Sequence, residues 1–204
     1  MALLGILTGL FLVEACGQRL SPQPTCNFVE NQQLQRVSWT TNLPVNVYLD
    51  SSVPQSYVSS IEGAMAIWNN LGQKVANHDF FVLRSGDPGS PTPAQDGYNK
   101  IYVMHTWEPN LANEQARTTI YWEGNRIYEA DTRIDAVNFS FFTDALNPDP
   151  MEVHLESLVL HELGHMLGLA HTTASDSVMQ PSLAGGQIRT TLGTTDVKDM
   201  QCQY

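Results

Sequence analysis

Basic residues are scarce in this chain. Its 204 residues include 10 Lys and Arg against 21 Asp and Glu, which gives a formal net charge of −11 at pH 7. An acidic surface repels the phosphates of nucleic acids and the anionic face of a membrane, so we expect neither as a partner. Charged residues make up only 15% of the chain and hydrophobic residues 42%, which is enough to bury the core of one domain of moderate size.

The sequence also lacks an apolar run that could comfortably cross a bilayer as a helix. The longest run, residues 2–13 (ALLGILTGLFLV), is too short for that but typical of a signal-peptide core. It ends in Val-Glu-Ala-Cys16 and resembles the export signal of a bacterial lipoprotein, whose cleavage exposes a cysteine for lipid modification. The alternative is an ordinary secretory signal cut after Ala15. We therefore expect residues 1–16 to be a signal peptide, and the protein to be lipid-anchored through Cys16 or secreted.

Cysteine is rare, with Cys16, Cys26 and Cys202 as the whole set. If Cys16 carries lipid, an even pair remains, and an exported protein is expected to oxidise it. A Cys26–Cys202 disulfide would close a loop of about 175 residues and stabilise the fold by several kcal/mol. The alternative is two buried free thiols.

The hydrophobic pattern predicts a domain with both strands and helices. Strands are expected at residues 45–49, 80–83, 100–105, 117–122 and 126–135, the last two as a hairpin. Helical periodicity predicts a helix that ends at Leu71-Gly72 and another from about Glu152 to Leu167. Because strands and helices do not alternate, this order indicates an α+β fold, with a mixed sheet and helices on one of its faces.

Three of the six histidines lie in one stretch, HELGHMLGLAH, residues 161–171. On a helix, His161 and His165 project from the same face one turn apart, so both rings can reach one metal ion. Glu162 is offset around the helix axis and can take a proton beside the ion without binding it. The alternative is a set of histidines on a solvated helix face.

The third histidine needs a break in the helix. In a continuing helix, His171 would point away from the face of His161. Gly168 can adopt a positive φ and turn the chain back, which would bring His171 round as a third ligand. Three imidazoles with an open fourth position are typical of a catalytic zinc site rather than a structural one.

This stretch resembles the zinc motif of the metzincin metalloproteases, His-Glu-x-x-His-x-x-Gly-x-x-His, and SVMQP at 177–181 resembles their Met-turn. Within the metzincins the chain most resembles the matrixins of microbial type. Its last residues, LGTTDVKDMQCQY (192–204), are similar to the matrixin closing helix. Residues 126–134 are similar to the strand ahead of the active-site helix in microbial relatives.

The resemblance implies a metzincin-like fold, with a twisted mixed sheet of about five strands, an active-site helix and a small C-terminal subdomain that ends in a helix. After a linker at residues 17–35, the catalytic domain would span residues 36–204. Its upper subdomain would be 36–168 and its lower subdomain 169–204.

The resemblance also implies a role for each motif residue. His161, His165 and His171 would bind one catalytic Zn²⁺, with Glu162 as general base and then proton donor. Met179 would form an apolar floor under the histidines, which is compatible with an ordinary core methionine. Pro181 to Leu183 would wall the pocket for the residue after the cleaved bond.

An edge strand in such enzymes pairs with the extended substrate, and Thr118, Thr119 and Ile120 are the candidates here. The sequence departs from the matrixins in four ways. Leu183 stands where they usually have Tyr, Thr172 stands where they usually have Ser, and the propeptide cysteine motif P-R-C-G-x-P-D is absent. The sequence also supports neither a calcium loop nor a second zinc site.

The predicted reaction is hydrolysis of peptide bonds in a peptide or protein substrate, by a zinc-activated water with Glu162 as the base. One alternative is a lipid-anchored zinc-binding surface protein without protease activity. Another is a zinc hydrolase of a non-protein amide. We expect a monomer that meets the membrane only through a lipid anchor.

Overall fold

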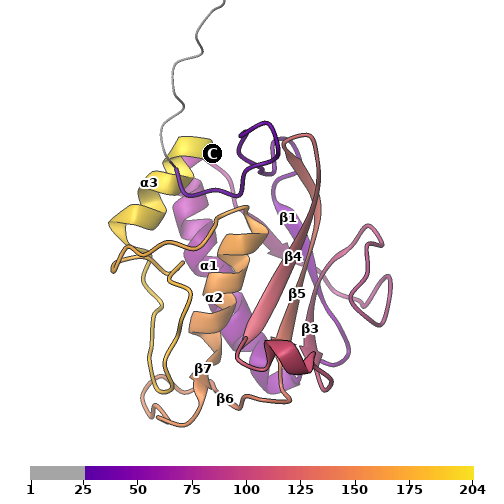
Figure 1. Ribbon diagram of the computed structural model, residues 1–204, viewed down its shortest axis with the longest axis vertical. Helices are drawn as coiled ribbons and strands as arrows, with labels where there is room; N and C mark the ends of the chain where they lie inside the picture. Colours follow the sequence, from indigo (N-terminus) through magenta and orange to yellow (C-terminus); the bar gives the residue numbers. More distant parts are fainter. Residues whose placement is uncertain (1–25) are drawn as a thin grey trace, which may run out of the picture.

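The structure is a computed structural model that describes residues 26–204. The predicted signal peptide and Cys16 lie outside the described residues, so their cleavage and lipidation stay predictions. Figure 1 shows a twisted sheet with two long helices, α1 and α2, packed on one of its faces, and a third helix, α3, at one end. In residues 26–204, no helix combines the length and the hydrophobicity that a membrane span requires.

The main sheet has five strands in the order β2-β1-β3-β5-β4. Neighbouring strands are parallel except for β4 and β5, which form the predicted antiparallel hairpin, so the expected mixed sheet of an α+β fold is confirmed. The hairpin places β4 at the edge of the sheet, where its outer side pairs with no other strand of residues 26–204. The strand bounds are β1 (Val45–Leu49), β2 (Phe81–Leu83), β3 (Asn99–Met104), β4 (Ala116–Glu123) and β5 (Arg126–Asp135).

The first helix is longer than the sequence predicts. A 3-10 turn (Gln55–Tyr57) leads into α1 (Val58–Val75), which continues past Gly72, where we expected it to end. A Cβ atom at Gly72 would lie 2.5 Å from the carbonyl oxygen of His78. Gly72 therefore allows the chain around His78 to pass close to the helix, and the helix does not end there.

The second helix begins later than predicted. Val153–His154 (β7) pairs in parallel with Phe141–Phe142 (β6), so α2 covers Leu155–Met166 and not the expected range from about Glu152. Strands of two residues leave no periodic pattern in a sequence. The chain closes with α3 (Thr194–Gln203), and a further 3-10 turn (Pro109–Leu111) precedes β4.

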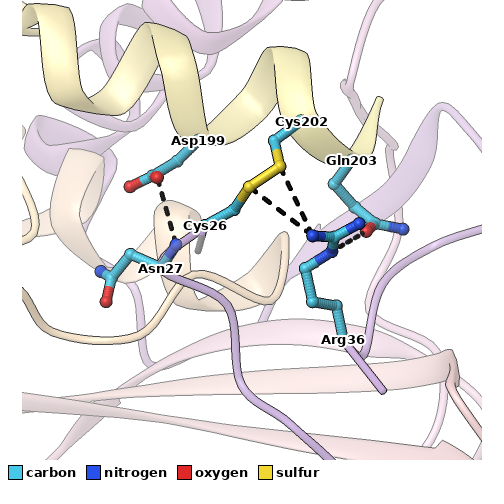
Figure 2. Close-up of a disulfide and its surroundings, with 6 residues drawn as sticks. All are labelled: Cys26, Asn27, Arg36, Asp199, Cys202 and Gln203. Atoms are coloured by element: carbon cyan, nitrogen blue, oxygen red, sulfur yellow. Dashed lines mark hydrogen bonds between the residues drawn. A yellow bond between two sulfur atoms is a disulfide. The ribbon is translucent and has the colours of Figure 1, made fainter. Parts of the chain in front are cut away.

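Residues 26–35, which we expected to belong to a linker, pack against the domain. Phe28 is buried and bridges to Leu169, and the backbone N–H of Val29 donates to the carbonyl of Gly168 at 2.8 Å. The predicted disulfide joins Cys26 to Cys202 of α3, with their Cα atoms 6.4 Å apart (Figure 2). This cross-link keeps the segment on the domain, a constraint that its polar sequence does not reveal.

Buried charges on β3 and β5 hold the Gly- and Pro-rich loop at residues 85–98. The fully buried Lys100 forms ion pairs with Asp50, at 3.2 Å, and with Asp87 in the loop. The carboxylate of Glu129 accepts the backbone N–H groups of Asp96 and Gly97, both at 2.8 Å.

Asp131 on β5 provides a test of this buried cluster. Its Oδ1 accepts the backbone N–H of Lys100 at 3.0 Å, while its buried Oδ2 has no hydrogen-bond partner among residues 26–204. Burial raises the pKa of this carboxyl from its ordinary value of 3.8 to about 7. An acid whose pKa is higher in the folded state stabilises the fold below its unfolded pKa, and this contribution disappears as the pH rises through the folded pKa.

We therefore expect the wild type to lose stability, relative to Asp131→Asn, between about pH 4 and pH 7.5, by on the order of 2 kcal/mol. Urea denaturation of both proteins across this range measures the difference. Parallel pH profiles for the two proteins would contradict the assignment.

Candidate metal centre

Helix α2 and the turn after it carry the three histidines. His161 and His165 lie one turn apart on α2, which ends at Met166. Gly168 follows with a φ of +97°, and a Cβ atom there would lie 2.3 Å from the carbonyl oxygen of Val37. Only glycine combines this backbone conformation with such a close approach, so Gly168 makes the turn that leads to His171.

The three rings meet at their Nε2 atoms. These atoms are 3.1 Å apart between His161 and His165, 3.2 Å between His161 and His171, and 3.0 Å between His165 and His171. Three ligands of a tetrahedral zinc ion at 2.0–2.1 Å would be about 3.3–3.4 Å from one another. The observed triangle is therefore within a few tenths of an ångström of the size that a zinc ion requires.

Hydrogen bonds to the other ring nitrogens favour the same conclusion. Nδ1 of His161 donates to the carbonyl of Val178, and Nδ1 of His165 donates to the carbonyl of Leu169, both at 2.8 Å. Since a carbonyl only accepts, Nδ1 carries the proton in both rings, and both Nε2 atoms present lone pairs. Burial, followed by the neighbouring His165, lowers the pKa of His161 to about 3, so its ring stays neutral. Converging lone pairs of this kind fit a zinc ion.

Met179 lies where the Met-turn was expected. It is buried, and a Cβ atom at Gly164 would come within 2.3 Å of its sulfur, so the thioether packs directly against α2 between the two helical histidines. The backbone N–H of Thr172 donates to the carbonyl of Met179 at 3.0 Å, which joins this turn to the residue after His171.

The buried carboxylate of Asp196 fixes the Met-turn to α3. It accepts hydrogen bonds from the hydroxyl of Ser177 at 2.5 Å, from the backbone N–H of Val178 at 3.0 Å and from that of Gly193 at 2.7 Å. Val178 in turn orients the His161 ring through its carbonyl. Asp196 thus supports the metal centre from outside its ligand set.

Asp196→Ala is expected to lower the free energy of unfolding by about 2–4 kcal/mol, because three buried donors lose their acceptor. Asp176 is a matched control, since its exposed carboxylate accepts two hydrogen bonds from Thr195, which lies on α3 next to Asp196. Asp176→Ala should have a much smaller effect in the same denaturation experiment. Equal losses in the two variants would argue against a special role for Asp196.

Glu162 lies beside the triangle but contributes no ligand to it. Its side chain is 4% exposed, and Oε2 accepts a hydrogen bond from the hydroxyl of Thr118 on β4 at 2.7 Å. The Thr118 oxygen is also 2.7 Å from the hydroxyl of Thr132 on β5. An ionised carboxylate only accepts, so Thr118 donates to Glu162 and accepts from Thr132. Burial raises the pKa of Glu162, against the lowering effect of His165 and of this hydrogen bond.

A hollow of about 320 Å³ opens over the histidines. Its sides come from β4, from α2 and from the segment after the Met-turn, where Pro181 and Leu183 line it as the sequence predicts. On β4 the lining residues include Ala116, Arg117 and Thr118. Thr119 and Ile120, the other predicted edge residues, lie further along β4 and do not line the hollow.

Two lining residues carry no signal in the sequence. Ser157 lies one turn before His161 on α2, and Arg189 comes from an irregular segment before α3. Neither belongs to a motif or a periodic pattern. His154, seven residues before His161, has its Nδ1 2.8 Å from the Ser157 hydroxyl and lies outside the histidine triangle.

Comparison with known proteins bears on this site. The peptidase M10 family model, described as matrixin, matches residues 79–204. Metalloendoproteinase 4-MMP of Arabidopsis thaliana is 40% identical over 120 residues, which is 59% of this chain and 29% of that protein. Metalloendoproteinase 5-MMP of the same plant is 40% identical over 52 residues, 26% of this chain and 14% of that protein.

More distant similarities were also found. A putative matrix metalloproteinase of Trichoplusia ni ascovirus 2c is 32% identical over 112 residues, 53% of this chain and 19% of that protein. Among solved structures, high choriolytic enzyme 1, a hatching enzyme zinc-protease from Oryzias latipes, is 14% identical with a TM-score of 0.41, over 87% of this chain and 93% of that one.

The chain spans 14 to 29% of the length of the curated relatives it matches. The family model, in contrast, matches more than half of this chain. The matched residues include β3, β4, β5, the three histidines, Glu162 and the Met-turn. On this match, and in agreement with the geometry of the site, the chain belongs to the matrixin family.

Proposed function

We propose that this protein is a zinc-dependent endopeptidase with Glu162 as its general base. One observation carries the proposal: the three Nε2 atoms converge beside a buried carboxylate, on the floor of a hollow that an unpaired strand edge borders. Membership of the matrixin family supports the same activity.

His161, His165 and His171 would hold the zinc ion. When bound, zinc supplies Lewis acidity, which lowers the pKa of water towards about 7 and polarises a carbonyl group. Glu162 takes a proton from the attacking water and gives it to the leaving amine. Its burial suits the first step, because a carboxyl with a raised pKa is a stronger base.

The outer edge of β4 supports an extended peptide as the substrate. In the described part of the chain no strand pairs with this edge, so its backbone groups can pair with a further strand, and Ala116 to Thr118 line the hollow. Backbone pairing would hold the substrate chain across the histidines, while side chains would enter pockets on either side.

Thr118 is expected to position Glu162 in this reaction. Thr118→Val should lower kcat by about tenfold, because a hydrogen bond to a charged group contributes about 1.5–3 kcal/mol. Thr118→Ser keeps the hydroxyl and should retain most of the activity. Steady-state kinetics on one peptide measures both variants, and an effect confined to KM would point to substrate pairing instead.

Metal content and peptide cleavage together test the proposed function. We expect one zinc ion per chain, cleavage of a mixed peptide library, and loss of cleavage on chelation that zinc restores. Zinc binding without cleavage of any peptide would favour one of two alternatives, a zinc-binding surface protein or a hydrolase of a non-protein amide. Absence of zinc binding would reject all three.

We also propose that the protein is exported and monomeric, with a lipid on Cys16 as its only link to the membrane. The Cys26–Cys202 disulfide supports export, because such bonds persist in oxidising compartments. Mass spectrometry of the mature N-terminus would distinguish a lipidated Cys16 from a secreted chain cut after Ala15.

A further inference from the structure

The guanidinium of Arg189 lies in the wall of the hollow and is held there by backbone groups. Nη1 donates to the carbonyls of Val178 and Gln180 at 3.4 and 3.2 Å, and Nη2 donates to the carbonyl of Ser182 at 2.6 Å. Its own backbone N–H donates to the hydroxyl of Ser157 on α2 at 2.7 Å. The cation therefore has a fixed position beside the segment that follows the Met-turn.

Arg189 forms no ion pair with a carboxylate of residues 26–204. Asp196 attracts its charge from beyond ion-pairing distance, but the Asp196 carboxylate already accepts hydrogen bonds from the Met-turn and from Gly193. Arg117, the other arginine that lines the hollow, is paired with Glu114 through two hydrogen bonds of 2.7 and 2.8 Å. A guanidinium has five N–H donors, and the three carbonyls occupy three of those on Arg189, so two remain for a ligand.

Arg189 also lies close to the metal centre. The carbonyl oxygen of Val178 accepts hydrogen bonds from both the His161 ring and the Arg189 guanidinium, so a single carbonyl separates the cation from a zinc-ligand ring. Pro181 and Leu183, expected to wall the pocket for the residue after the cleaved bond, line the same part of the hollow. A ligand for Arg189 would therefore belong to that side of the substrate.

We infer that Arg189 recognises a carboxylate in the part of the substrate that follows the cleaved bond. The inference rests on the proposed peptidase function and adds a substrate class to it. The carboxylate has two sources, the side chain of an Asp or Glu just after the cleaved bond or the free C-terminus of a peptide cut near its end. Both give the charge-assisted pairing that a guanidinium with spare donors forms best.

The hydrogen bonds that Arg189 makes to the segment after the Met-turn do not explain why a positively charged side chain occupies this position. Three carbonyls accept hydrogen bonds from the guanidinium but leave its positive charge in a half-buried place, where pairing with a carboxylate is favourable. Ser157 lines the hollow one turn before His161 and accepts the backbone N–H of Arg189, so a substrate side chain that reaches Arg189 would meet a small polar residue there.

Matched peptides test the inference on the full zinc-loaded chain. One pair differs only by Glu or Gln at the position after the cleaved bond, and a second pair differs only by a free or an amidated C-terminus close to it. We expect kcat/KM to be at least about tenfold higher for the acidic member of one pair, mainly through KM. The pair that shows the preference identifies the source of the carboxylate.

Three variants assign the preference to Arg189. Arg189→Gln should remove it, and Arg189→Lys should keep part of it. Arg84→Gln is the matched control. Arg84 follows β2, which lies at the edge of the sheet opposite β4, and its guanidinium donates to the side chain of Asn46 on β1. The preference of this variant should equal that of the wild type.

A binding measurement separates this inference from the proposed activity. Fluorescence anisotropy of the same peptides on zinc-loaded Glu162→Gln, with and without Arg189→Gln, needs no turnover. Tighter binding of the acidic peptide, lost with Arg189, supports the inference even if the wild type cleaves nothing. The inference would be overturned if the wild type cleaved and bound both members of each pair equally well. A preference for the acidic peptide that survives Arg189→Gln would also overturn it.

Discussion

Replacing Glu162 with glutamine is expected to abolish peptide cleavage and to leave zinc binding almost unchanged. The amide is nearly the same size as the carboxylate and its oxygen can still accept the hydrogen bond from Thr118, so the local packing is kept. It cannot accept a proton at neutral pH. General acid–base catalysis contributes about 10²–10⁴-fold to a rate, and we expect a loss at or above the upper end of this range because Glu162 acts in both proton transfers.

The measurement pairs kcat/KM with metal analysis of the same samples. Glu156→Gln is the matched control, because Glu156 lies on the same helix but packs against Gly63 of α1, away from the hollow. Its cleavage rate should stay within about threefold of the wild type. A Glu162→Gln protein that cleaves at the wild-type rate would contradict the assigned role, and one that has lost zinc would show that the side chain supports the ligands instead.

Opening the Cys26–Cys202 disulfide is expected to lower the free energy of unfolding by about 5 kcal/mol, since the bond joins residues 176 positions apart and constrains a long loop in the unfolded chain. Beside the disulfide, Figure 2 shows two hydrogen bonds that do not involve the sulfurs: the backbone of Asn27 donates to Asp199 at 3.1 Å, and Arg36 donates to Gln203 at 2.7 Å. Both contacts are partly exposed and cannot replace a covalent link.

The loss should also reach the metal centre. The carbonyl of Asn27 accepts the backbone N–H of Ala170 at 2.9 Å, and its side-chain amide donates to the Ala170 carbonyl at 2.5 Å. Ala170 directly precedes His171. The disulfide thus tethers the segment that holds the third histidine in place, and we expect weaker zinc binding when it is opened.

Urea denaturation and a competition assay with a chromophoric chelator measure these two effects in the wild type and in a Cys26→Ser/Cys202→Ser variant. Reductant should shift the wild type towards the variant and should leave the variant unchanged, which also controls for any effect at Cys16. A variant as stable as the wild type would show that the non-covalent contacts suffice.

The sequence by itself determined the parts of this protein that depend on local spacing. The β4–β5 hairpin, the helical interval between His161 and His165 and the break at Gly168 are each set within a few residues, so their positions follow from backbone geometry. The family motif rests on the same spacing, which explains why the three histidines that meet in the structure could be named from the sequence.

Tertiary structure decided what depends on contacts between distant segments. Gly72 continues a helix because a remote carbonyl approaches it, and residues 26–35 join the domain through a bond to α3. Thr118 meets Glu162 across 44 positions, a pairing that only the packing of β4 on α2 creates. Arg189 keeps donors for a ligand because the folded chain brings three carbonyls to its guanidinium, whereas Asp196, the carboxylate that attracts it, forms no ion pair with it. A sequence pattern records the period of one element, whereas these features depend on which elements meet.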